Sequence, residues 1–116
     1  MERVSYDEQV AVEPVENVHL AQLAAGDRTS IQTFEVEPGA LVPEHSHPHE
    51  QCGFVFEGTA TFLVDGDEIV IGPNDSYVIP GDEPHAVENR GDTPVFGVDI
   101  FSPPRSNPDW GDSGDE

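Results

Sequence analysis

Lysine is absent from this chain, and arginine is scarce. The 116 residues include four basic residues, all of them arginine, against 24 aspartates and glutamates, and the formal net charge is −20. A surface this acidic repels nucleic acids and anionic membranes, so neither is expected as a partner. We interpret the charge as that of a folded protein adapted to high salt, where screening removes the repulsion between carboxylates.

The same charge also fits an intrinsically disordered acidic chain, but the regularly spaced apolar segments described below argue against that interpretation. The absence of lysine resembles the composition of proteins from salt-accumulating archaea. A protein of this kind should lose its structure in dilute buffer, because its carboxylates are then unscreened. Circular dichroism spectra recorded between molar KCl and dilute buffer test this expectation, and an unchanged spectrum would contradict it.

Cysteine and long apolar runs are also nearly missing. Cys52 is the only cysteine, which excludes an intrachain disulfide. The first residues lack a basic region followed by an apolar stretch, so we expect no signal peptide. No apolar run approaches the roughly 20 residues that a membrane-spanning helix needs. A cytoplasmic location is the default expectation.

Glycine and proline, by contrast, are plentiful at 11 residues each, which suits short strands joined by tight turns. The pair Asp65-Gly66 is typical of a two-residue hairpin turn. Residues 15–25 fit either a helix or a strand. If that segment is counted as a strand, the chain has about eight strands at near-regular spacing, which predicts an all-β sandwich or barrel. The clearest strands are 30–36, 52–56, 59–64, 68–71, 76–79, 85–89 and 94–101.

The length allows one small domain with one core. We expect an N-terminal arm or strand at residues 1–28 and the barrel at residues 29–105. Residues 106–116 are polar, acidic and glycine-containing, and are predicted to be a disordered tail.

Histidine is concentrated in one place. His45, His47 and His49 fall within five residues, and His85 follows far downstream, in a chain with five histidines. If His45 and His47 lie on a strand, alternation points both side chains to the same face. Two imidazoles on one face, joined by a third from a distant strand, can build a transition-metal site. The alternative is a solvated polar loop with no metal.

The spacing of these residues closely resembles the two conserved motifs of the cupin superfamily. The first motif has Gly39, five residues, His45, one residue, His47, three residues, Gln51, six residues and Gly58. The second has Pro80, four residues, His85, three residues and Asn89. The resemblance covers most of residues 29–101 and implies a double-stranded β-helix, or jelly-roll barrel.

The second motif departs from the family pattern at two positions. Asn74 replaces its opening glycine, and Asp82 stands where the glycine after Pro80 is usual. We expect Gly81, one residue earlier, to supply the conformational freedom of that loop.

The resemblance implies one divalent transition metal (Fe, Ni, Mn or Zn) bound by His45, His47, Gln51 and His85. Glutamate is usual at the fourth position, so Gln51 leaves the metal without charge compensation, which favours binding, isomerisation or lyase chemistry over oxygenase chemistry. Glu50 is an alternative fourth ligand. The imidazoles bind metal only when neutral, so affinity should fall below about pH 6.

Neighbours of these ligands are given other roles. His49 matches no ligand position and is expected at the rim of the site. Cys52 follows Gln51 on the opposite face of the strand and is expected in the core.

A further motif, Asp99-Ile100-Phe101-Ser102-Pro103-Pro104-Arg105, ends the last predicted strand. Asp99 and Phe101 share a strand face by alternation. Arg105 has the planar fork that grips a carboxylate, although it could instead pair with one of the many surface carboxylates.

With Gln51, this ending is similar to the small cupins of pectin degradation, which convert 4,5-unsaturated monouronates to open-chain keto acids. That resemblance implies that Asp99 is the general acid/base, that Arg105 holds the carboxylate and that Phe101 shapes the pocket.

Three functions therefore remain open: a uronate-ketonising enzyme, another cupin metalloenzyme such as a dioxygenase or sugar isomerase, and a non-catalytic binding barrel. In each, the expected partner is a small carboxylate or sugar acid. A homodimer is also expected, because small cupins commonly pair through sheet edges.

Overall fold

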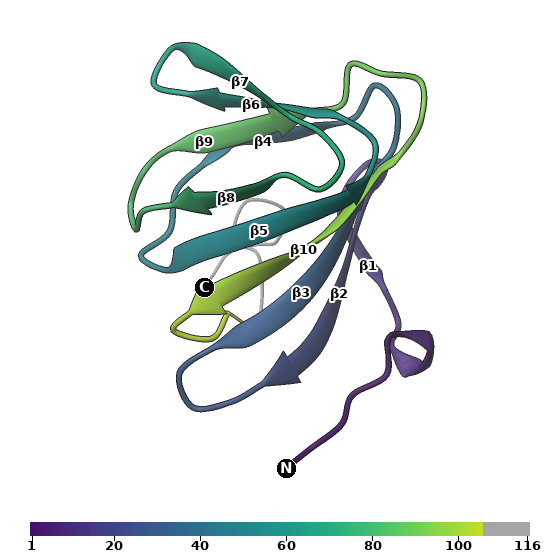
Figure 1. Ribbon diagram of the computed structural model, residues 1–116, viewed down its shortest axis with the longest axis vertical. Helices are drawn as coiled ribbons and strands as arrows, with labels where there is room; N and C mark the ends of the chain where they lie inside the picture. Colours follow the sequence, from purple (N-terminus) through teal and green to yellow (C-terminus); the bar gives the residue numbers. More distant parts are fainter. Residues whose placement is uncertain (106–116) are drawn as a thin grey trace.

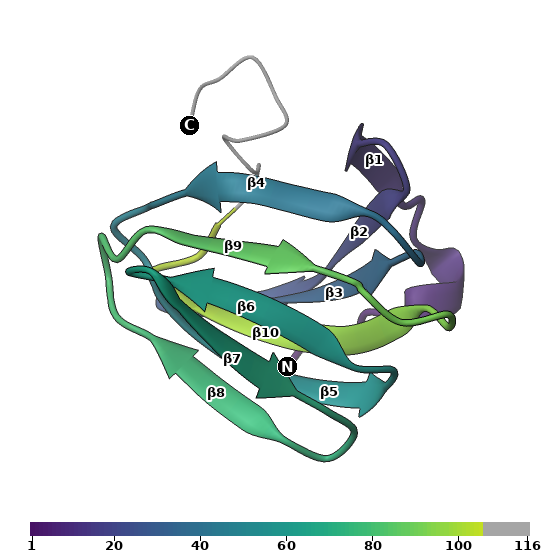
Figure 2. The same cartoon turned by 90° about the horizontal axis from the view of Figure 1, so that it is seen from above.

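The chain folds into two facing antiparallel β-sheets, and the computed structural model describes residues 1–105 (Figures 1 and 2). The larger sheet has six strands in the order β1-β2-β3-β10-β5-β8, and the smaller sheet has four in the order β4-β9-β6-β7. A short 3-10 helix, η1 (Tyr6–Glu8), precedes them. The strands are β1 Val12–Val15, β2 Val18–Ala25, β3 Ser30–Val36, β4 Leu41–His45, β5 Glu50–Glu57, β6 Ala60–Val64, β7 Asp67–Ile71, β8 Ser76–Ile79, β9 His85–Glu88 and β10 Val95–Ser102.

The predicted all-β jelly-roll class is confirmed. Residues 18–25, left open between helix and strand, form β2. Residues 1–105 contain ten strands against the roughly eight predicted. The strands β1 and β4 are short and contain Pro14 and Pro43, and a proline within a run weakens its strand pattern.

The core lies between the two sheets and is built from the inward-facing residues of each strand. In β10 the buried positions alternate, from Val95 through Asp99 to Phe101. Val18, Val55 and Val95 are completely buried. Such alternation places polar groups on the inner face wherever the sequence puts them in register with the apolar ones.

Cys52 illustrates the other face of the same sheet. It points away from Gln51, as predicted, but it is exposed, so its assignment to the core is wrong. The outer face of β5 is open to solvent, and alternation alone cannot say which face of an apolar strand is covered.

The turns follow the sequence closely. Asp65 and Gly66 both have positive φ (53° and 82°), as the predicted two-residue hairpin requires. Asn74 and Asp82, which stand where the family favours glycine, also have positive φ (72° and 68°). Asparagine and aspartate are among the non-glycine residues that best tolerate this left-handed region.

Asp82, and not Gly81, therefore provides the unusual backbone conformation, which corrects the expectation for this loop. Gly81 is needed for a different reason. A Cβ atom at this position would lie 2.5 Å from the carbonyl oxygen of Pro48, so the loop before β9 packs directly against the loop that carries the histidines.

The predicted boundary between an N-terminal arm (residues 1–28) and the barrel (residues 29–105) stays a prediction. Within the predicted arm, β2 pairs with β3 in the six-stranded sheet. The predicted tail, residues 106–116, lies outside the described residues. Among residues 1–105, no helix has the length and apolar character to cross a membrane.

Candidate metal and substrate site

Three imidazoles converge at the end of the smaller sheet where β4 ends and β9 begins. His45 ends β4, His85 begins β9, and the two are direct partners across the antiparallel pair. His47 lies just beyond the end of β4, so strand alternation does not orient it. One ligand nitrogen of each of the three rings lies within 4.8 Å of the others. Within residues 1–105, this cluster is the group suited to hold a metal ion.

Each ring is oriented by a backbone carbonyl two residues away. The Nδ1 atom of His45 lies 2.9 Å from the oxygen of Pro43, and that of His85 lies 2.8 Å from the oxygen of Glu83. The corresponding distance from His47 to the oxygen of His49 is 3.2 Å. A carbonyl oxygen can only accept, so Nδ1 carries the hydrogen and the Nε2 lone pair is available to a metal.

Burial keeps these rings neutral. It lowers the pKa of His45 to about 3, with further lowering by His85 and Arg105. Burial likewise lowers the pKa of His47 to about 4 and lowers the pKa of His85. Neutral imidazole is the form that ligates metals. The expected loss of metal affinity below about pH 6 accordingly moves to lower pH.

Gln51 joins the cluster from the opposite sheet. Its Oε1 atom lies 3.1 Å from Nε2 of His47, and it is buried on the inner face of β5. A neutral ring has one N–H, and His47 faces an acceptor oxygen on both sides, so one of these contacts brings two acceptors together. A cation held by Nε2 and Oε1 removes that conflict, so the four residues fit a divalent transition metal.

Glu50 and His49 are not among the residues whose ligand atoms cluster. Glu50 is exposed and lies on the opposite strand face from Gln51. His49 is half-buried, with its ring 5.3 Å from that of His47 and 6.0 Å from that of Phe101. Its role at the rim stays a prediction.

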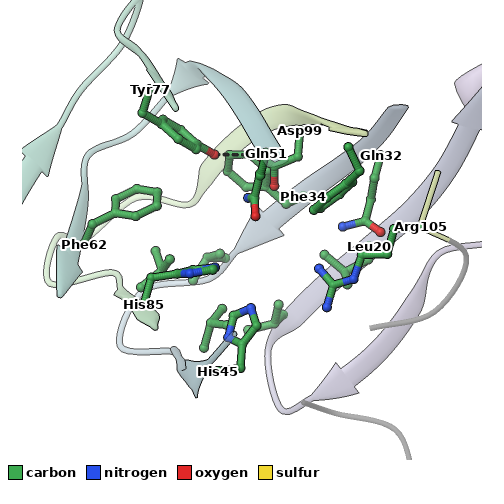
Figure 3. Close-up of a pocket in the computed structure, with 15 residues that line it drawn as sticks. Leu20, Gln32, Phe34, His45, Gln51, Phe62, Tyr77, His85, Asp99 and Arg105 are labelled. Atoms are coloured by element: carbon green, nitrogen blue, oxygen red, sulfur yellow. Dashed lines mark hydrogen bonds between the residues drawn. The ribbon is translucent and has the colours of Figure 1, made fainter. Parts of the chain in front are cut away.

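A pocket with a volume of about 50 Å³ opens beside these donors (Figure 3). At one probe sphere per water, this is room for roughly four water molecules or a compact ligand. Its polar lining comes from both sheets and the segment after β10. The apolar lining is Val18, Leu20, Phe34, Val36, Val42, Phe62, Val87 and Phe101, and the polar lining is Gln32, His45, Gln51, Tyr77, His85, Asp99 and Arg105.

Asp99 faces this pocket from β10, as its alternation with Phe101 predicts. The Tyr77 hydroxyl donates a hydrogen bond of 2.6 Å to its Oδ1 atom (Figure 3). Burial raises the pKa of Asp99 to about 6, while hydrogen bonds from Tyr77 and Gln51 and the charge of Arg105 oppose the shift. Burial and the charge of Asp99 raise the pKa of Tyr77. A carboxyl that titrates near neutral pH can both take up and release a proton.

Tyr77 was not predicted as a site residue. It reaches Asp99 across Gly53, which is the direct partner of both residues in the sheet. A Cβ atom on Gly53 would lie 2.1 Å from the Tyr77 ring and 2.5 Å from Oδ1 of Asp99. A glycine inside an otherwise apolar strand is the sequence signal for such a close approach.

Arg105 and Phe101 form the remaining wall. Both are almost fully buried, at 4% and 1% exposure. The guanidinium carbon of Arg105 lies 5.0 Å from the centre of the Phe101 ring, and that ring also lies 5.7 Å from the ring of His47. The backbone N–H of Arg105 donates to Oγ of Ser30 at 3.0 Å.

The family profile described as a cupin domain matches residues 32–101, more than half of the chain. The chain belongs to the cupin family. In this cupin, the matched segment includes the three clustered histidines, Gln51 and Asp99.

Curated relatives match this cupin over 79 residues, or 67% of its length. Mannose-1-phosphate guanylyltransferase of Escherichia coli (strain K12) is 34% identical, with 16% of its length covered. Tetracenomycin polyketide synthase protein TcmJ of Streptomyces glaucescens is 31% identical, with 53% covered. The chain thus spans about half or less of the length of these relatives.

Among solved structures, KdgF from Halomonas sp. superposes with a TM-score of 0.83 at 20% identity, over 91% of this chain and 96% of that one. The polyketide cyclase RemF from Streptomyces resistomycificus gives 0.78 at 24% identity, over 88% and 79%. These likenesses establish the fold.

Proposed function

We propose that this cupin is a metal-dependent enzyme that converts a 4,5-unsaturated monouronate to its open-chain keto acid. The observation that carries the proposal is the meeting of three kinds of group in one small pocket. These are a metal-donor set, a buried carboxyl with a raised pKa and a buried arginine. A sugar acid needs each of them, since it presents hydroxyl oxygens, an exchangeable proton and a carboxylate.

The proposed reaction is an isomerisation, so it needs no oxidant. The C1 hydroxyl loses its proton to Asp99 as the bond between C1 and the ring oxygen breaks, which leaves an aldehyde at C1 and an enolate at C5. The enolate then takes up a proton at C4, giving the C5 ketone. The proton that Asp99 accepted from the C1 hydroxyl is the one that it delivers to C4. The pKa of Asp99, about 6, suits both directions of transfer near neutral pH.

The other side chains hold the substrate in position. Arg105 binds the carboxylate with its planar fork, and the charge of that guanidinium is stronger in a buried pocket than at the surface. The Phe101 ring packs against Arg105 and forms the wall on which the sugar ring rests. His45, His47, Gln51 and His85 would hold a divalent metal, which polarises a substrate oxygen when bound.

The lining of the pocket supports a small polar ligand, because it combines apolar side chains with the polar groups of Gln51, Asp99 and Arg105. The resemblance of the Asp-x-Phe-Ser-Pro-x-Arg ending and of Gln51 to the pectin-degradation cupins supports the same substrate class.

The test is turnover of 4,5-unsaturated galacturonate by metal-reconstituted protein in molar KCl, followed by loss of the double-bond absorbance. We expect loss that depends on added metal, with no oxygen consumed. Oxygen uptake would indicate a dioxygenase instead. Binding without turnover of this acid or of simple aldoses would indicate a binding barrel.

A further inference from the structure

The side chain of Gln51 stands between the metal donors and the carboxyl that the proposed reaction uses. Asp99 and Tyr77 both pair with Gly53, which follows Gln51 by two residues on β5. Gln51 is therefore the diagonal neighbour of both on the inner face, a separation that a long side chain can span. Gly53 has no side chain to fill the space between them. Figure 3 shows the Gln51 amide between the Tyr77–Asp99 pair and His85.

The two ends of this amide face different kinds of group. Its Oε1 atom lies 3.1 Å from Nε2 of His47, on the side of the metal donors. Its nitrogen donates to the Asp99 carboxylate and to the Tyr77 oxygen. The hydroxyl hydrogen of Tyr77 is already given to Oδ1 of Asp99, so both oxygens accept from the amide. A reversed amide would set its oxygen against these two oxygens, so the contacts on both sides agree on one orientation.

We propose that Gln51 is a positioning residue for Asp99 as well as a metal ligand, with one amide serving both halves of the pocket. Its oxygen would bind the metal, and its N–H groups hold the Asp99 carboxylate in place. A glutamate at this position would keep the ligand oxygen, but it would lose the N–H groups and set a second carboxylate against Asp99. The identities of residues 51 and 99 are therefore coupled. The catalytic consequence rests on the proposed function, whereas the coupling itself does not.

Burial makes this coupling strong. Gln51 and Asp99 are 6% and 7% exposed, so water does not readily replace a donor that the carboxylate loses. A hydrogen bond to a charged group is stronger than one between neutral groups, and a buried charge left without its donor bears the full cost of desolvation. Salt screens a buried pair of charges much less than an exposed pair, so the coupling persists in molar KCl.

The test is a double-mutant cycle on the melting temperature of the metal-free chain in molar KCl. Gln51→Glu exchanges the amide nitrogen for an oxygen, and Asp99→Asn removes the charge that this oxygen would meet. We expect Gln51→Glu to lower the melting temperature by at least about 5 °C more in the wild-type background than in the Asp99→Asn background. The cost of burying the new carboxylate is common to both backgrounds and cancels in the cycle.

Metal content separates this bridging role from that of a ligand alone. Gln51→Glu should still retain Zn²⁺ through dialysis, because the ligand oxygen is kept and gains charge. In metal-loaded protein, kcat for unsaturated galacturonate should nevertheless fall about 10- to 100-fold with KM unchanged, since Asp99 has lost a charged hydrogen bond.

Gln9→Glu is the matched control. It makes the same one-atom change at an amide that donates to the Ser5 carbonyl, outside the pocket. Its effect on the melting temperature should be equal with and without Asp99→Asn, because residues far apart and without shared partners contribute additively.

Equal melting shifts of Gln51→Glu in the two backgrounds would overturn the bridging role, and so would loss of zinc from Gln51→Glu. If Gln51→Glu does not fold, the proposal requires that the double variant does, and an unfolded double variant contradicts it. A zinc-loaded Gln51→Glu with wild-type kcat would leave Gln51 as a metal ligand only. Failure of the proposed reaction is a separate result: wild type would leave unsaturated galacturonate intact while the melting cycle shows the expected coupling.

Discussion

The two halves of the pocket are built by contacts of very different range. On the metal side, each imidazole is oriented by a carbonyl two residues away in sequence. On the substrate side, Asp99 is held by Tyr77 across 22 residues, and Arg105 is anchored to Ser30 across 75. The orientation of the imidazoles is therefore encoded in short motifs, while the substrate half depends on strand order. A family of such barrels can keep the first and vary the second.

The largest expected effect is on the metal half. His85→Ala removes one of the three clustered donors, so metal affinity should fall on the order of 100-fold or more and turnover should disappear. Metal content by elemental analysis after dialysis measures it. His49→Ala is the matched control, since that ring lies outside the cluster, and loss of metal from this control would break the assignment of ligands.

Asp99→Asn tests the substrate half at its centre. The amide cannot accept a proton, so we expect kcat to fall about 10²–10⁴-fold with metal content unchanged. The wild-type pH profile gives a second check. Because Asp99 must be ionised to accept a proton, kcat/KM should fall as pH drops through about 6, the raised pKa of that carboxyl. A flat profile between pH 5 and pH 8, measured at about one-unit steps, would argue for another base.

Arg105 and Arg90 make a matched pair for substitution, because one is buried and the other is exposed. Arg105 is buried in the pocket, whereas Arg90 is exposed and paired with Glu68 and Glu88. Arg105→Ala should raise KM by roughly 10- to 100-fold, the range for a hydrogen bond to a charged group. Arg90→Ala should leave kcat and KM as in wild type. Equal effects of the two substitutions would mean that charge alone, and not position, matters.

The smallest effect is expected at the edge of the substrate half. Tyr77→Phe removes the hydrogen bond that opposes the raised pKa of Asp99, so the acid limb of kcat/KM should move to higher pH. Above that limb the rate should fall less than about tenfold. Gly53→Ala supplies a harsher comparison, because the added Cβ collides with both the Tyr77 ring and Oδ1 of Asp99 and should lower the rate further. A drop in rate with no shift would make Tyr77 a packing residue only.

Much of the fold was predictable. Alternating apolar runs and the Asp65-Gly66 turn predict most of the strands and the all-β class, because period and turn chemistry are local properties. β1 and β4 were missed because Pro14 and Pro43 interrupt the pattern. Cys52 was misplaced because alternation assigns relative faces and says nothing about which face another layer covers.

The sequence by itself determined how the rings of His45 and His47 are oriented, since a carbonyl two residues away contacts Nδ1 of each ring. It also determined that Asp99 and Phe101 share a face. Only the tertiary structure decided that Tyr77 and Gln51 meet Asp99, because their register depends on the order β8-β5-β10. Strand order follows from how two sheets close around one core, and a local pattern carries no information on that closure.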